Sequence, residues 1–230
     1  MLLEGIIFDK DGTIFGFDET WIHWCKEIIE VISSGDRNLK KAIAKVLDFD
    51  LKNLSFRSGS IAITASNRDI AGAICSVAES WSTSELEKFL AKASSDAPIA
   101  EITPLIPFFN QLRGNFLKTG INTNDSEMSA ISQLNSVGII RKLDFVAGYD
   151  SGYEAKPSAE PLLAFAKKTL IAPEKIAMVG DSVSDLVSGK LAGMKSIAVL
   201  TGPATESELA PYADVVLSSI RELPKLLDLN

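Results

Sequence analysis

The sequence predicts an α/β fold, in which a doubly wound, parallel, Rossmann-like sheet forms the core and a second, mostly α-helical domain is inserted into it. Three observations predict this architecture. Short, wholly apolar runs end abruptly in polar residues, as strands buried on both faces do. In residues 97–230 these runs alternate with stretches of helical periodicity, which is typical of a parallel sheet. Residues 17–96 contain mostly helical patterns and no run that resembles a buried parallel strand.

The first buried strand leads into a pair of acids. Ile6, Ile7 and Phe8 form the apolar run, and the sequence Asp-Lys-Asp-Gly-Thr follows from residue 9 to 13. In an extended chain, residues i and i+2 point to the same side, roughly 7 Å apart. Asp9 and Asp11 are therefore expected to face one spot, which requires a cation between them or a shared proton.

Two other interpretations of this stretch compete. An EF-hand calcium loop opens with the same letters, but it requires Gly at its sixth position and Glu at its twelfth. Counted from Asp9, those positions hold Ile14 and Thr20, so we reject the EF-hand. An ordinary acidic loop stays possible as long as this stretch is considered alone.

The inserted segment reads as a bundle of helices. Between Asp18 and Gly35, apolar residues recur at three- and four-residue steps, which predicts an amphipathic helix. Further helices are expected over residues 39–48, over 67–80 and from Thr83 onward, and residues 56–64 read as a loop that feeds a short extended piece.

The remainder alternates between strands and helices. Strands are expected at residues 116–123, 145–148, 176–179, 196–200 and 213–217, and helices at 104–113, 126–137, 159–170, 183–192 and 220–227. The predicted domains are therefore an α/β core, residues 1–16 and 97–230, and a helical insert, residues 17–96. Ligands of such sheets bind at the carboxyl ends of the strands.

Composition limits the classes of function. The chain has 230 residues, of which 46% are hydrophobic, and a formal charge of −7, which argues against general nucleic-acid binding. No apolar run approaches the roughly 18 residues of a membrane span, and the start of the chain lacks the pattern of a signal peptide. Cys25 and Cys75 form no metal-binding pattern, and reduced thiols are expected. These features predict a cytoplasmic protein, monomeric or homodimeric, with no membrane or nucleic-acid partner.

Three further polar clusters fall at strand ends or helix starts: Thr123-Asn124, Lys156-Pro157, and the run Gly180-Asp181-Ser182-Val183-Ser184-Asp185. Each alone has an ordinary structural explanation, as a turn, a helix start or a helix cap. Together with Asp9 and Asp11, however, they bring four carboxylates to the ends of strands in one sheet. Such a set needs a hard cation, and oxygen ligands suit Mg²⁺.

These four motifs in this order resemble those of the haloacid dehalogenase-like (HAD) superfamily, and the helical insert resembles the cap domain of its phosphoglycolate-phosphatase-like branch. The resemblance implies that Asp9 is the nucleophile and Asp11 the general acid and base. It implies that Thr123 and the amide of Asn124 hold the phosphoryl oxygens and that Lys156 neutralises charge. Asp9, the Asp11 carbonyl, Asp181 and Asp185 would form the Mg²⁺ site.

The expected activity is that of a magnesium-dependent phosphatase acting on a small phosphorylated metabolite, phosphoglycolate-like or a sugar phosphate, through an aspartyl-phosphate. An acid two residues after the nucleophile separates such phosphatases from the dehalogenase members. Arg57, in a loop of the insert, is the best candidate for contact with the substrate's anion. The alternatives are a hexose-phosphate mutase with the same core and a non-catalytic sensor of a phosphorylated ligand.

Overall fold

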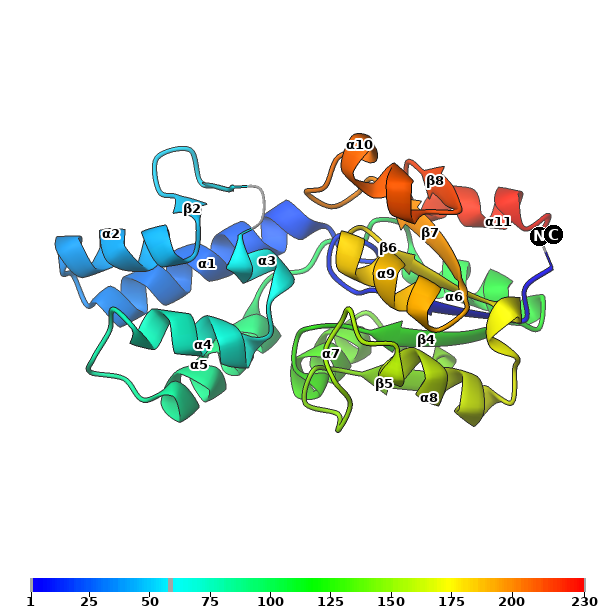
Figure 1. Cartoon of the computed structure of the whole chain (residues 1–230), viewed down its shortest axis with the longest axis horizontal. Helices are drawn as coiled ribbons and strands as arrows, with labels where there is room; N and C mark the ends of the chain where they lie inside the picture. The colour runs from blue at the N-terminus through cyan, green and yellow to red at the C-terminus, as the bar shows by residue number, and fades with distance from the viewer. Residues whose placement is uncertain (1, 58–59, 230) are drawn as a thin grey trace.

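The computed structural model describes residues 2–57 and 60–229. Figure 1 shows two lobes: a sheet covered by helices, which contains both ends of the chain, and a lobe of helices α1 to α5 beside it. The helical lobe is connected to the sheet directly after the first strand, and the chain returns from it before helix α6 (Leu105–Gly114).

Six parallel strands form the core sheet. Their order across the sheet is β5-β4-β1-β6-β7-β8, with the bounds Gly5–Phe8 for β1, Lys118–Asn122 for β4, Phe145–Ala147 for β5, Ile176–Gly180 for β6, Lys195–Val199 for β7 and Val215–Leu217 for β8. Strand β1 is central and pairs with β4 on one side and β6 on the other. The predicted doubly wound parallel sheet is confirmed.

Helices cover both faces of this sheet because successive residues of the buried strands point to opposite faces. Ile6 and Phe8 belong to one apolar cluster, with helices α6, α7 (Glu127–Ser136) and α11 (Leu223–Leu226). Ile7 belongs to another, with helix α8 (Glu160–Thr169). Helix α9 (Val183–Leu191) contacts β6 and β7. Short helical segments complete the core: α10 (Glu206–Leu209) and 3₁₀ turns at Ile140–Lys142, Pro173–Lys175, Ala210–Tyr212 and Ile220–Glu222.

The helical lobe contains α1 (Phe17–Ser33), α2 (Arg37–Val46), a two-stranded hairpin of β2 (Phe49–Asp50) and β3 (Ser55–Phe56), α3 (Ile61–Thr64), α4 (Asn67–Cys75) and α5 (Thr83–Asp96). The expectation of a short extended piece ending at Thr64 was wrong, because residues 61–64 form a helical turn. The Ser60 side chain starts this turn by accepting a hydrogen bond from the backbone N–H of Ala62, as an N-cap residue does.

Each lobe has its own apolar core. One cluster is built only from residues between Phe17 and Ala97, while the other three use only residues outside that interval. The division of the chain at residues 17–96 stays a prediction, and this separation of the clusters supports it. No helix among the described residues combines the length and the apolar character that crossing a membrane would need.

Candidate active site

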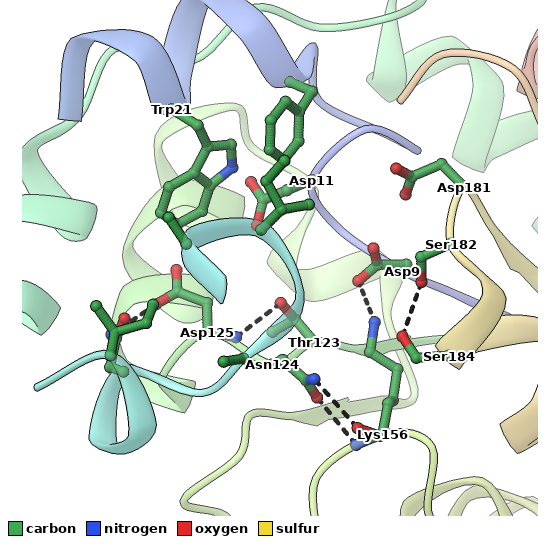
Figure 2. A pocket seen from close by; sticks show the side chains of 16 residues that line it. Asp9, Asp11, Trp21, Thr123, Asn124, Asp125, Lys156, Asp181, Ser182 and Ser184 are labelled. Carbon is green, nitrogen blue, oxygen red and sulfur yellow. Dashed lines mark hydrogen bonds and ion pairs between the residues drawn. The ribbon is translucent and has the colours of Figure 1, made fainter. Parts of the chain in front are cut away.

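The sheet topology gathers the predicted residues at one edge. Phe8, the last residue of β1, lies opposite Ile121 of β4 and Val179 of β6. Parallel strands end at the same edge, so the residues that follow them meet there. Asp9 therefore lies between Thr123 and Asp181, and its backbone N–H donates to the Val179 carbonyl at 2.8 Å. All three side chains line one cavity, as Figure 2 shows.

Lys156 links two of the acids. Its Nζ donates to Asp9 Oδ1 and to Asp185 Oδ1, both at 2.6 Å, and its side chain is buried. Burial raises the pKa of Asp9 to about 7, although the charge of Lys156 lowers it. Burial lowers the pKa of Lys156, but the two carboxylates outweigh that effect and hold it above its usual value. The lysine therefore stays charged beside the central carboxyl group.

Asp181 lies in a space that two glycines leave open. A Cβ atom on Gly12 would stand 2.4 Å from Asp181 Oδ2, and one on Gly202 only 1.7 Å from it, so no side chain fits at either position. Gly12 also has φ of 76°, which other residues rarely adopt. Thr13 Oγ1 donates to Asp181 Oδ1 at 3.1 Å. Burial, and then the charge of Asp9, raise the pKa of Asp181 well above its usual value.

These acids fit a divalent cation. Oxygen atoms of Asp9, Asp181 and Asp185 lie within 4.8 Å of one another, and all three residues are buried. In the described part of the chain, Lys156 carries the one ammonium group within hydrogen-bond distance of any of them. Three buried carboxyl groups around one cation leave negative charge in excess, and their hard oxygen atoms are the ligands that Mg²⁺ prefers. Asp185 is the most constrained of the three, because its Oδ2 also accepts from the Ser182 backbone at 3.0 Å.

Thr123 and Asn124 follow β4. Thr123 is buried, lines the cavity, and accepts a hydrogen bond from the Asp125 backbone at 3.1 Å. The Asn124 side chain exchanges two hydrogen bonds with the backbone of Lys156: its Oδ1 accepts at 2.9 Å and its Nδ2 donates at 3.3 Å. Asn124 therefore holds in place the segment that carries the lysine, a contact that the sequence did not indicate.

Asp11 also lines the cavity, next to a buried cation that the sequence analysis overlooked. The side chain of Lys10 is fully buried, and its Nζ lies 2.7 Å from Asp11 Oδ2 and 3.2 Å from Asp125 Oδ2. It donates to Gln133 Oε1 at 2.6 Å as well. Burial raises the pKa of Asp11, while Lys10 acts in the opposite direction. The sequence places this lysine between two acids at the end of a buried strand, but it does not show which distant residues would pair with it.

Replacing Lys10 with methionine is expected to destabilise the protein by about 3 kcal/mol, because Asp11 and Asp125 would lose a buried partner. Urea unfolding at neutral pH measures this change. The matched control is Lys118→Met, which removes an exposed partner of Asp144 and should cost less than about 1 kcal/mol. Adding Asp125→Asn to Lys10→Met should recover part of the loss; an unchanged double variant would contradict the ion-pair explanation.

The cavity is small, about 50 Å³. From the core it is lined by Asp9, Asp11, Thr123, Asn124, Asp125, Lys156, Asp181, Ser182 and Ser184, and from the helical lobe by Phe17, Trp21, Ala62, Ile63, Ala65, Asn67 and Ile70. Arg57 is not among these residues. It is exposed and lines an adjoining cleft of about 590 Å³, which shares Ile63, Asp181, Ser182 and Ser184 with the cavity. Contact between Arg57 and a substrate therefore stays a prediction.

The sequence analysis did not assign Trp21, Asn67, Ser182 or Ser184 to the site. Trp21 was expected only on the apolar face of its helix, and Asn67 only at a helix start. Asn67 does begin α4, but its Nδ2 also donates to Asp125 Oδ1 at 3.3 Å, across the two lobes. Whether such a residue reaches the cavity depends on how the lobes pack, and sequence periodicity does not contain that information.

Comparisons with known proteins point to one family. Residues 6–199 match the family of haloacid dehalogenase-like hydrolases. A phosphoglycolate phosphatase from Chromobacterium violaceum is 39% identical over 105 residues, which make up 46% of this chain and 46% of that protein. The phosphoglycolate phosphatase of Escherichia coli K12 is 31% identical over 119 residues, 51% of this chain and 47% of that protein. The chain thus matches about half the length of these curated relatives.

Solved structures share the fold across nearly the whole chain. A HAD phosphatase from Thermococcus onnurineus superposes with a TM-score of 0.67 at 21% identity, covering 97% of each chain. A β-phosphoglucomutase from Clostridium difficile superposes with a TM-score of 0.64 at 19% identity, covering 96% of this chain and 93% of that one. At these identities the similarity establishes the architecture only. A protein named as a phosphatase and one named as a mutase share this architecture.

Proposed function

The chain belongs to the haloacid dehalogenase-like hydrolases, and on that premise we propose that it is a magnesium-dependent phosphatase that hydrolyses monoesters of small metabolites through an aspartyl-phosphate on Asp9. One observation carries the proposal. The Asp9 carboxyl group lies at the centre of the sheet edge, 2.6 Å from a buried ammonium group and inside a cavity that Asp11 also lines. A nucleophile, a cation and a second acid thus surround a space of phosphate scale.

The first half of the proposed reaction transfers the phosphoryl group to Asp9. An Asp9 oxygen attacks phosphorus while the bond from phosphorus to the ester oxygen breaks, and Asp11 gives its proton to that oxygen. Lys156 offsets the repulsion between the carboxylate and the phosphate dianion, because its charge lies next to the attacking group. The Thr123 hydroxyl lines the same space and is suited to donate to a phosphoryl oxygen.

In the second half, a water molecule attacks the phosphorus of the aspartyl-phosphate. Asp11, now unprotonated, takes a proton from this water, and the bond between Asp9 and phosphorus breaks to release inorganic phosphate. Burial raises the pKa of Asp11 above its usual value, which favours the protonated form that the first half needs, while Lys10 acts in the opposite direction.

Asp9, Asp181 and Asp185, with the Asp11 carbonyl as a further candidate, would hold the divalent cation. When bound, this cation would neutralise charge on the phosphate and on Asp9. Asp185 is bound by Lys156 and by Ser182, which favours a role for it in supporting the site through water.

Mg²⁺ binding is expected to release at least one proton at pH 6 and fewer protons at pH 9. The pKa of Asp9 is about 7 in the metal-free protein and that of Asp181 is raised, so a cation at pH 6 must displace protons from these carboxyl groups. Mg²⁺ affinity should accordingly fall as pH falls through 7. Calorimetric titration in two buffers of different ionisation enthalpy measures the released protons. The absence of proton release at pH 6 would contradict the proposed ligands.

The function itself is tested by phosphate release from a panel of esters, including 2-phosphoglycolate, several sugar phosphates and 4-nitrophenyl phosphate, with Mg²⁺ or with a chelator. Magnesium-dependent release is expected without any added sugar bisphosphate. If release required a sugar bisphosphate, or if phosphate were moved within a hexose phosphate instead, the mutase would be the better explanation. No turnover of any ester by the folded, Mg²⁺-loaded protein would overturn the proposal and favour a sensor.

A further inference from the structure

The cavity is charged on one side only. Among the side chains that the structure describes, the ionisable ones that line it belong to the core: Asp9, Asp11, Asp125, Lys156 and Asp181. The described residues of the helical lobe that line it are uncharged, and Asn67 and Trp21 are the ones that carry a hydrogen-bonding group in the side chain. If the phosphate binds next to Asp9 and Lys156, the rest of the substrate faces this uncharged wall.

None of the described residues on that wall offers a cation to a second anionic group. Lys156 already bridges two carboxyl groups, and Lys10 is occupied by Asp11, Asp125 and Gln133 without lining the cavity. Ile63 lines both the cavity and the outer cleft, whereas Arg57 lines the cleft alone. A carboxylate on the leaving group would thus be buried against apolar side chains, near the acids that line the cavity and without a cation to pair with. Burying a charge in this way is costly.

The same wall presents one donor that lacks a hydrogen bond of good geometry. The indole Nε1 of Trp21 and Asp11 Oδ1 are both buried, and neither makes such a bond. The indole is turned toward the Asp11 carboxyl group, as Figure 2 shows, and its weak interaction with that group lowers the pKa of Asp11. The neighbouring Trp24 differs, because its Nε1 donates to the Leu90 carbonyl at 3.4 Å. A buried donor without a partner is costly unless a ligand atom satisfies it.

We propose that Trp21 and Asp11 bind the ester oxygen of the substrate between them and that the leaving group is a small, uncharged alcohol; the inference rests on the proposed phosphatase function. The ester oxygen accepts a hydrogen bond from the Trp21 indole. As the bond from phosphorus to this oxygen breaks, its electron pair stays on the oxygen, which receives the proton from Asp11 Oδ1. Asp11 Oδ2 is held by Lys10, which leaves Oδ1 as the oxygen that faces the substrate.

The first part of the test is a comparison of two esters of similar size. 2-Hydroxyethyl phosphate has an uncharged leaving group, and 2-phosphoglycolate has a carboxylate in the same place. The wild-type kcat/KM should be at least about tenfold higher for the hydroxyethyl ester. Ile63→Arg, which adds a cation to the wall, should narrow or reverse this preference. Equal or faster turnover of 2-phosphoglycolate by the wild type would overturn the inference while leaving the phosphatase function intact.

The second part concerns Trp21. Trp21→Phe keeps an aromatic ring and removes the N–H, so kcat/KM for 2-hydroxyethyl phosphate, a poor leaving group, should fall about tenfold or more. For 4-nitrophenyl phosphate, whose leaving group needs little help, the loss should be less than about threefold. Trp24→Phe, which removes a buried N–H outside the site, is the matched control and should change both values equally. An equal loss on both esters in Trp21→Phe would reduce Trp21 to a packing role and overturn its assignment.

Failure of the underlying function gives a different result. If no ester, including 4-nitrophenyl phosphate, is hydrolysed by the wild type, the phosphatase proposal fails and the subsite fails with it. If Trp21→Phe fails to fold, circular dichroism will show it. In that case the wild-type preference between 2-hydroxyethyl phosphate and 2-phosphoglycolate, and its change in Ile63→Arg, still test whether the leaving group is uncharged.

Discussion

Replacing Asp9 with asparagine is expected to lower phosphate release by about 10⁴-fold or more, the largest loss for any single substitution in this chain. An amide has nearly the size of the carboxyl group but does not attack phosphorus, so the covalent intermediate cannot form. The rest of the site should keep its arrangement, because Asp9 is positioned by its backbone hydrogen bond to Val179. Steady-state phosphate release and acid-quench trapping of phosphorylated protein measure the effect.

The matched control for this variant is Asp214→Asn. Asp214 also lies next to a strand of the sheet, where its carboxyl group accepts a hydrogen bond from the Ser196 N–H at 2.8 Å, but it comes before β8 rather than at the carboxyl edge. Its substitution should leave kcat within about twofold of the wild type. If Asp9→Asn kept more than a few per cent of the activity, or if the phosphorylated protein still formed, Asp9 would not be the nucleophile.

The parts of the site that the sequence predicts are those at strand ends. An apolar run that stops at a polar residue marks both the strand and its end, and a parallel sheet brings such ends together. Asp9, Thr123 and Asp181 follow this rule, and all three line the cavity. Lys156 lies on a segment between elements, and the sequence predicts it only through its place among the four motifs, because a Lys-Pro pair alone reads as a helix start.

The parts that the sequence misses depend on contacts between distant segments. Trp21 has the spacing of a core residue in an amphipathic helix, and it does pack against Trp24, with ring centroids 5.0 Å apart. Only the packing of the helical lobe on the sheet turns its N–H toward Asp11. The burial and pairing of Lys10 depend on distant segments in the same way, since its partners Asp125 and Gln133 lie 115 and 123 positions further along the chain.

Replacing Lys156 with methionine is expected to lower kcat/KM by roughly 10²–10³-fold. The ammonium group is within 2.6 Å of both Asp9 and Asp185, and methionine has similar bulk without the charge. The variant would leave two buried carboxyl groups and the phosphate dianion without this cation. Phosphate release under saturating Mg²⁺ measures the loss. The control is Lys175→Met, because Lys175 pairs with Glu4 where both side chains are about half exposed, and activity should stay within twofold of the wild type.

The pH dependence of the Lys156→Met variant separates an electrostatic role from a purely structural one. Burial raises the pKa of Asp9, and the charge of Lys156 is the largest influence that lowers it. Removing that charge must raise the pKa further, so a larger fraction of the nucleophile is protonated near neutral pH. The acid limb of the kcat/KM profile should therefore move to higher pH in the variant, and the loss relative to the wild type should shrink between about pH 7 and 9. A uniform loss at every pH would mean that Lys156 only shapes the cavity, because misplaced groups would lower the rate without changing the protonation of Asp9.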